Sequence, residues 1–384
     1  MKPLSEKIMS VPASGIRRFF DLVAEMDDVI SLGVGEPDFV TPWRIREAAI
    51  WSLEKGMTTY TSNYGLLELR IEIVKKMNER YGVEWDPRRE VLVTVGVSEA
   101  LDTAFRAILN PGDEVLIPEP CYVSYAPCVA FAGGVPIPVP TRAESGFKTH
   151  AGDVAELITP RTKAILLSYP TNPTGATMDA AGLQAIVDIC VANDLYILSD
   201  EIYDRLSYDA PHVCVASLPG AYDRTILLNG FSKAYAMTGW RIGYACAPAA
   251  IIEVMMKIHQ YTMLCAPITA QVAALEALRR GDRDADEMCA DYDRRRRMFV
   301  KGLNDIGMDC PLPGGAFYAF PSVKRFGLSA EEFAERLLKE ERVLVVPGDV
   351  FGEGGIGHIR CCYATASEKL QEALRRMERF TKSL

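Results

Sequence analysis

Three short apolar runs, each ending in polar residues, constrain the fold of this chain more than any other feature. They lie at 164–168, 196–200 and 225–228. Strands that are apolar on both faces are typical of parallel sheets covered by helices on either side. Helical patterns between the runs, such as 178–193, complete an alternation of strands and helices. The sequence therefore predicts a doubly wound α/β domain with polar residues gathered where the strands end.

Each of the three runs delivers a chemically useful side chain to that edge. Asn172 follows the first run, Asp200 closes the second and Lys233 follows the third. An aspartate directly after a buried strand is costly unless a cation pairs with it. Ser232 and Arg241 suit a phosphate ester, and a partly desolvated lysine beside them suits a Schiff base with an aldehyde. Phosphate and aldehyde together describe pyridoxal 5′-phosphate (PLP).

Several motifs carry a resemblance to a known family. The stretch 232–243 fits the pattern Ser-Lys-x-x-x-x-x-Gly-x-Arg-x-Gly, and the segments 14–20, 33–39 and 169–175 add further matches in the same order. Together they resemble the class I/II aminotransferases, the fold type I PLP enzymes, and are most similar to the aspartate/aromatic subgroup. The likeness covers nearly the whole chain. It implies a large, mostly parallel, doubly wound sheet domain and a smaller α/β domain.

The resemblance also implies a function and a domain plan. The expected reaction is PLP-dependent transfer of the amino group from an aromatic or aspartate-type L-amino acid to a 2-oxo acid such as 2-oxoglutarate. The expected domains are an arm with part of the small domain at 1–41, a large PLP-binding domain at 42–280, and a small domain at 281–384.

Two alternatives stay open at this point. A PLP-dependent C–S β-lyase would share the lysine, the aspartate and the phosphate site. An aminotransferase for another donor, such as alanine, methionine or a diaminopimelate derivative, is the second alternative. Arg17 and Arg18 are candidates for contacting a distal carboxylate, although surface charge is the simpler interpretation.

By resemblance, five residues act on the coenzyme ring and the reacting atoms. Lys233 attaches the coenzyme and, as a free amine, moves the proton from the substrate Cα. Asp200 pairs with the protonated pyridine nitrogen, and this pair makes the ring an electron sink. Tyr203 donates a hydrogen bond to the phenolic oxygen, and Tyr122 stacks on the ring. Asn172 meets both the phenolic oxygen and the substrate carboxylate.

The phosphate and the substrate carboxylate need sites of their own. A strand, a glycine and a helix meet near residue 96, and such a junction points backbone N–H groups at an anion. The predicted phosphate site comprises Gly96, Val97, Ser98, Ser232 and Arg241. Capping of the helix by Ser98 is compatible with this role.

Three further residues receive roles by resemblance alone. Tyr60 would reach the phosphate of the other subunit, which implies a homodimer with shared active sites. Gly35 and Arg360 would bind the substrate carboxylate, with Arg360 projecting from a strand.

Composition excludes several other classes of function. The 384 residues carry a net charge of −9, which argues against a nucleic-acid site, and the run 294–297 of four arginines is interpreted as a solvated helix face or a partner contact. Ten cysteines without a Cys-x-x-Cys pair and four scattered histidines predict no metal. The absence of a secretory signal and of a membrane-spanning run predicts a cytoplasmic protein.

The C-terminal part of the chain also shows readable patterns. They predict a long helical region at 250–280, helices at 282–306 and 330–341, a strand at 343–346, and a flexible glycine-rich loop at 352–357.

Overall fold

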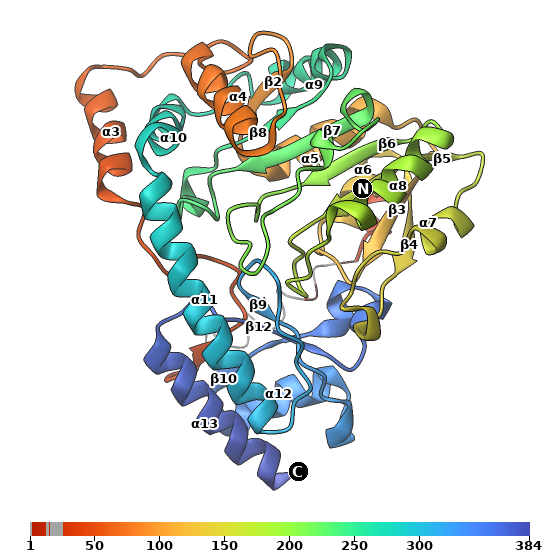
Figure 1. The fold of residues 1–384 in the computed structure, drawn as a ribbon, viewed down its shortest axis with the longest axis vertical. Coiled ribbons are helices and arrows are strands. Elements are labelled where there is room, and N and C mark those ends of the chain that lie inside the picture. The colour runs from red at the N-terminus through yellow and green to blue at the C-terminus, as the bar shows by residue number, and fades with distance from the viewer. Residues whose placement is uncertain (1, 13–14, 16–25) are drawn as a thin grey trace.

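The computed structural model describes residues 2–12, 15 and 26–384. Arg17, Arg18 and the stretch 16–23, where apolar residues at helical spacing predict a short helix, lie outside the described residues. A seven-stranded sheet in the order β2-β8-β7-β6-β5-β3-β4 forms the upper body in Figure 1. Its strands are β2 (Val91–Thr94), β3 (Glu114–Glu119), β4 (Val135–Pro140), β5 (Thr162–Ser168), β6 (Tyr196–Asp200), β7 (Thr225–Gly230) and β8 (Gly243–Cys246). All neighbouring pairs are parallel except those that involve β8.

Helices cover both faces of this sheet, as the apolar strands predict. Leu166 and Leu198 pack with α5 (Gly96–Ile108) and α9 (Ala249–Thr262) in one apolar cluster. Ile165 and Ile197, which point to the opposite face, pack with α8 (Ala180–Ala192) in another. Because side chains alternate along a strand, every second residue belongs to the same cluster. The predicted doubly wound architecture is confirmed.

The remaining helices of this body are α3 (Trp43–Glu54), α4 (Leu67–Tyr81), α6 (Tyr125–Ala132), α7 (Ala151–Glu156) and α10 (Ile268–Arg280), and α1 (Glu6–Met9) precedes them. The prediction of one continuous helical region at 250–280 is wrong. The chain leaves α9 after Thr262, Leu264 adopts a φ of 71°, and Pro267 stands immediately before α10. Proline lacks a backbone N–H, so it suits the start of a new helix and not the middle of an old one.

The smaller body combines the end of the chain with a piece from its beginning. β1 (Ile30–Ser31) pairs in parallel with β10 (Val343–Leu344), while β11 (Val346–Pro347), β12 (Ile359–Cys362) and β9 (Tyr318–Ala319) form an antiparallel sheet. The helices are α11 (Asp282–Asp305), α12 (Ala330–Glu341) and α13 (Ser367–Ser383). The strand predicted at 343–346 is thus divided between two small sheets.

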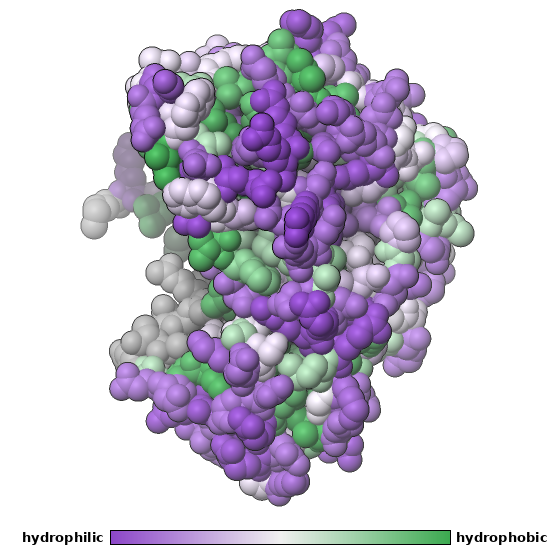
Figure 2. Space-filling view, turned by 60° about the vertical axis from the view of Figure 1, so that its left-hand side comes forward, coloured by the Kyte–Doolittle hydropathy of each residue, from purple (hydrophilic) through white to green (hydrophobic). Residues whose placement is uncertain are grey.

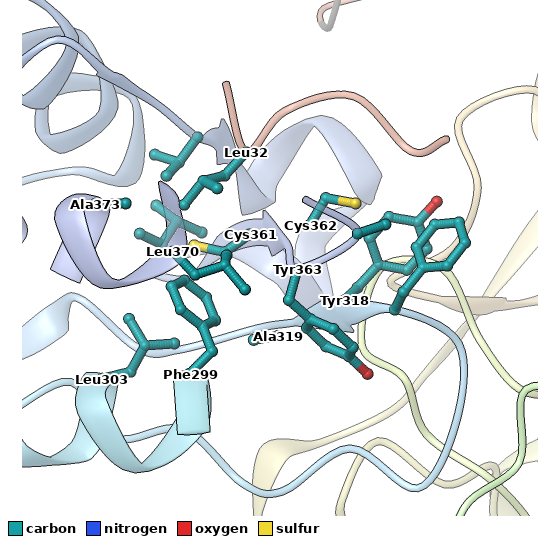
Figure 3. Packing of buried hydrophobic residues seen from close by; sticks show 14 of the residues in the cluster. Leu32, Phe299, Leu303, Tyr318, Ala319, Cys361, Cys362, Tyr363, Leu370 and Ala373 are labelled. Carbon is teal, nitrogen blue, oxygen red and sulfur yellow. The ribbon is translucent and has the colours of Figure 1, made fainter. Parts of the chain in front are cut away.

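An apolar core holds the smaller body together, and α11 runs into it from the larger one (Figure 1). Phe299 and Leu303 of α11 pack beside Cys361 of β12 and Leu370 of α13, as Figure 3 shows. Leu32, from the segment after β1, joins the same cluster. The core therefore fixes the edge of β12 and β9 that faces the large sheet.

The arginine run on α11 is not simply a solvated face. Arg296 is fully buried, donates to both carboxylate oxygens of Asp209 at 2.7 and 2.9 Å, and lies 4.4 Å from the ring centre of Tyr208. Arg295 is also buried and donates to Asp38 at 2.7 Å. The interpretation as a solvated face is wrong for these two residues, because acidic side chains from distant segments pair with them in addition to acidic residues of the same helix.

The glycine-rich segment 352–357 also differs from the predicted flexible loop. It contains a short 3-10 turn, Glu353–Gly355, and a side chain at Gly355 would clash with the backbone of Gly348. Its glycines therefore permit close packing. None of the helices in the described ranges combines the length and apolar character needed to cross a membrane.

Candidate active site

A cavity of about 610 Å³ opens at the carboxyl ends of β5, β6 and β7. Asn172, Asp200 and Lys233 all line it, so the expectation that three strand ends would meet is confirmed. Tyr318 and Arg360, from β9 and β12, line it from the side of the smaller body. The cavity is therefore built from both bodies, in the position where doubly wound sheets hold ligands.

Asp200 closes β6 with a carboxylate that is only 5% exposed. It accepts hydrogen bonds from the Tyr125 hydroxyl at 2.8 Å and from the backbone N–H of Ile202 at 3.2 Å. Burial raises the pKa of this carboxyl from 3.8 to about 6, although both hydrogen bonds act in the opposite direction. No lysine, arginine or histidine in the described part of the chain forms an ion pair with it.

Lys233 lies in the turn after β7 and reaches into the cavity. Its Nζ donates to the carbonyl of Gly35 at 2.7 Å and lies 5.8 Å from the ring centre of Tyr203. Burial lowers the pKa of the amine from 10.5 to about 8. Within the described residues this amine has no carboxylate at ion-pair distance, so it is a half-buried cation held by neutral groups.

The start of α5 forms one wall of the cavity through Val97 and Ser98. Ser98 does not cap the helix: the N–H of Val95 donates to the Glu99 carboxylate at 2.5 Å instead. The other Glu99 oxygen lies 2.5 Å from Nδ1 of His259, which is fully buried. This pair fixes the first turn of α5 and leaves the Ser98 hydroxyl available to the cavity.

Ser232 and Arg241 line the same wall. Arg241 adopts a left-handed conformation with φ of 52°, and a Cβ added at Gly96 would lie 2.8 Å from its Nη2 atom. Glycine at 96 therefore lets the guanidinium come up against the helix start. A guanidinium, two hydroxyls and free helical N–H groups at one place form a site for an anion.

Arg360 of β12 enters the cavity from the opposite side and is 4% exposed. Its guanidinium donates to Asn172 Oδ1 at 2.8 Å and to the carbonyl of Gly33 at 2.6 Å, while its buried Nε has no partner. The ring centres of Tyr318 and Phe351 lie 4.7 and 4.9 Å from it. The structure gives it no ion-pair partner in the described ranges, so its charge is free for a ligand carboxylate.

The structure gathers nearly all of the predicted site residues. Those that line the cavity are Gly35, Val97, Ser98, Tyr122, Asn172, Asp200, Tyr203, Ser232, Lys233, Arg241 and Arg360. Gly96 lies directly behind Arg241. Tyr60 is 80% exposed and does not line the cavity of its own chain. The sequence pattern predicts Tyr122 early in a helix, but it lies in the turn before α6, which begins only at Tyr125.

Two tyrosines that line the cavity were not singled out from the sequence. Tyr125 follows Tyr122 by three residues, and this spacing is the one signal that both face the same place. Tyr318 stands in an apolar stretch, where an aromatic residue is typical of a core, so no signal distinguished it. No group of three or more histidine, cysteine, aspartate or glutamate side chains suited to a metal occurs among the described residues.

Comparison with known proteins agrees with this geometry. Residues 27–377 match the family aminotransferase class I and II. An aspartate aminotransferase of Pyrococcus abyssi is 46% identical over 98% of this chain and 97% of its own. The aromatic-amino-acid aminotransferase 2 of Thermococcus litoralis is 44% identical over 99% and 98%. The crystal structure of an aromatic aminotransferase from Pyrococcus horikoshii superposes with a TM-score of 0.92 at 46% identity and covers 96% of this chain and 99% of that one. The chain therefore belongs to the class I and II aminotransferases, with their fold type I architecture, and is an aminotransferase that uses pyridoxal 5′-phosphate.

Proposed function

We propose that this aminotransferase takes the amino group from an aspartate-type or aromatic L-amino acid and passes it to a 2-oxo acid such as 2-oxoglutarate. The observation that carries the proposal is a set of three ionisable groups, buried Asp200, buried Arg360 and half-buried Lys233, which share one cavity without ion-pair partners in the described structure. Such groups are costly to bury unless a ligand completes them. The names of the relatives from Pyrococcus and Thermococcus support the choice of donors.

The residues present fit the coenzyme. Its cationic ring nitrogen suits Asp200, its aldehyde suits Lys233, and its phosphate suits the anion site, where Gly96 leaves room for Arg241. When bound, the coenzyme supplies a carbonyl that bonds covalently to amino groups and a cationic ring that withdraws electrons from the substrate Cα. Val97, Ser98 and Ser232 would hold the phosphate beside Arg241.

The carboxylate of Asp200 and the hydroxyl of Tyr203 would set the protonation of the bound coenzyme. The Asp200 carboxylate would keep a proton on the ring nitrogen of the bound coenzyme, because an ionised carboxylate in this buried place favours a cation next to it. Tyr203 would donate a hydrogen bond to the phenolic oxygen, and Tyr122, in the turn before α6, would stack on the ring. Asn172, already held by Arg360, would also bind the phenolic oxygen.

Lys233 and Arg360 would handle the substrate. With a pKa of about 8, a share of the Lys233 amine is neutral near pH 7, so Nζ can accept the proton from the substrate Cα. Arg360 binds the α-carboxylate through the two arms of its guanidinium, and Gly35 lies beside it. The carboxylate and the Cα are then fixed relative to the base, which lowers the entropic cost of proton transfer.

We further propose a homodimer with shared active sites. Trp43, Ile50, Trp51 and Leu53 of α3 are exposed apolar side chains, and exposed Tyr60 follows them in sequence. Figure 2, which brings the α3 side forward, shows apolar surface between hydrophilic regions on this face. A patch of this kind supports burial against a second copy, with Tyr60 reaching the partner's phosphate site.

The proposed domain division has part of the small domain and the arm at 1–41, the large domain at 42–280 and the small domain at 281–384. The cavity is lined from both bodies, so approach of the small domain would bring Arg360 onto the substrate carboxylate.

The proposal is tested by a half-reaction screen. The coenzyme-loaded enzyme is mixed with one L-amino acid at a time, without an oxo acid, and the coenzyme absorbance is followed. Aspartate or an aromatic amino acid should convert the absorbance in a single turnover, and 2-oxoglutarate should restore it. Release of pyruvate and ammonia without any oxo acid would instead identify a C–S lyase and overturn the proposal.

A further inference from the structure

Tyr318 contacts two residues of the proposed mechanism, Tyr203 and Arg360. Its hydroxyl oxygen is 2.8 Å from the hydroxyl oxygen of Tyr203, and its ring centre is 4.7 Å from the guanidinium carbon of Arg360. The side chain is 1% exposed and lines the cavity. It projects from β9, where it stands opposite Cys362 of β12.

The hydrogen count fixes the direction of the bond between the two tyrosines. Each hydroxyl carries one hydrogen and can accept further bonds. If Tyr203 donates its hydrogen to the phenolic oxygen of the coenzyme, it has none left for Tyr318. The bond at 2.8 Å must then run from Tyr318 as donor to Tyr203 as acceptor. Hydrogen bonds in such a chain polarise and strengthen one another.

The ring of Tyr318 acts on Arg360. The guanidinium lies near two aromatic rings, those of Tyr318 and Phe351, and its buried Nε makes no hydrogen bond. Its orientation therefore depends on the two carbonyl acceptors and on these rings. An aromatic face attracts a guanidinium and limits its rotation.

From these contacts we infer that Tyr318 is a positioning residue with two separable parts, a hydroxyl that supports the donor role of Tyr203 and a ring that orients Arg360. The inference rests on the proposed function, because the acceptor of Tyr203 is the phenolic oxygen. It extends that function because one side chain contacts both Tyr203, which acts on the coenzyme, and Arg360, which binds the substrate carboxylate.

The sign of the expected effect follows from charge. A hydrogen bond donated to the phenolic oxygen draws negative charge from it, which lowers the proton affinity of the neighbouring nitrogen contributed by Lys233. Loss of the Tyr318 hydroxyl weakens that bond, so this nitrogen should hold its proton to higher pH. The other groups that act on Lys233 are Glu36, Asp200, Arg360 and Cys362, and they remain in place when only a hydroxyl is removed.

The test is an absorbance titration of the coenzyme-loaded protein without substrate. In Tyr318→Phe the pH midpoint should rise by about 0.5 to 1 unit, in the direction of Tyr203→Phe but by less. Tyr363→Phe is the matched control: its hydroxyl is also buried, donates to the carbonyl of Ala316 at 3.1 Å, and lies outside the cavity lining. Its midpoint should not move.

A second variant isolates the ring. In Tyr318→Leu the KM for the amino acid should rise about 3-fold or more above that of Tyr318→Phe, because only the leucine variant loses the aromatic face next to Arg360. Melting temperatures of all variants separate this effect from a general loss of packing, which would lower stability without splitting the two KM values.

Each outcome decides one part of the inference. A midpoint that falls in Tyr318→Phe would mean that Tyr203 donates to Tyr318, and an unchanged midpoint would remove the hydroxyl's role. Equal KM values in the two Tyr318 variants would remove the role of the ring. If the unmodified protein shows no titrating coenzyme band at all, the proposed function itself fails.

Discussion

Asp200→Asn should stabilise the coenzyme-free protein, but only where the aspartate is ionised. The ordinary pKa of 3.8 rises to about 6 in the fold, and at 1.36 kcal/mol per unit this corresponds to about 3 kcal/mol. As pH rises, the Asp200 carboxyl loses its proton first in the unfolded chain. The free energy of unfolding therefore falls by this amount between about pH 4 and pH 6 and stays lower at higher pH. Asparagine carries no charge and avoids the loss.

The hydrogen bonds of Asp200 limit the gain. The single side-chain oxygen of an asparagine can accept one of the two hydrogen bonds that Asp200 accepts. The Tyr125 hydroxyl can instead donate to the Ser168 oxygen, which lies 2.9 Å away. The net gain at pH 8 should therefore be about 2 kcal/mol, vanishing near pH 4.

Urea unfolding of the coenzyme-free protein and variant at fixed protein concentration measures the Asp200→Asn effect at both pH values. An equal change in unfolding free energy at pH 4 and pH 8, or a loss of stability at pH 8, would refute the reasoning about burial of this carboxylate. Coenzyme affinity supplies the complementary readout, because it should fall in the variant as the partner for the ring nitrogen is lost.

Three further predictions concern other walls of the cavity. Lys233→Ala should abolish amino-group transfer in a steady-state assay, and retained normal turnover would contradict the proposed base. Arg360→Gln should raise the KM for the amino acid about 100-fold, since it removes a charge-assisted clamp on the carboxylate; a change below 2-fold would count against that clamp. Glu99→Gln should raise the dissociation constant of the coenzyme about 5-fold in a fluorescence titration, because the charged acceptor that holds the start of α5 against His259 is lost; an unaltered constant would show that this turn is held by other contacts.

The large domain was readable from the sequence because its signals are local. Runs such as 164–168 are apolar on both faces, and polar residues at their ends fall on one edge once the strands are parallel. The positions of Asn172, Asp200 and Lys233 follow from that rule alone. The roles of Gly35, Tyr122 and Arg360 came from the resemblance, and the structure adds that all three line the same cavity.

Features that depend on distant partners were not readable. The burial of Arg296 requires Asp209, which lies 87 residues away, and no local pattern indicates that contact. The helical spacing of apolar residues continues through the break before α10, so the sequence pattern does not reveal it. The break occurs where Leu264 adopts a left-handed backbone conformation. Tyr318 resembles any core aromatic until the fold brings it against Tyr203 and Arg360.

We propose that one amine, the Nζ of Lys233, holds the coenzyme covalently. Borohydride reduction of the PLP-loaded protein, followed by peptide mass mapping, tests it most directly. We expect one pyridoxyl-phosphate adduct, located on the peptide that contains Lys233. An adduct on another lysine, or none on coenzyme-saturated protein, would contradict it.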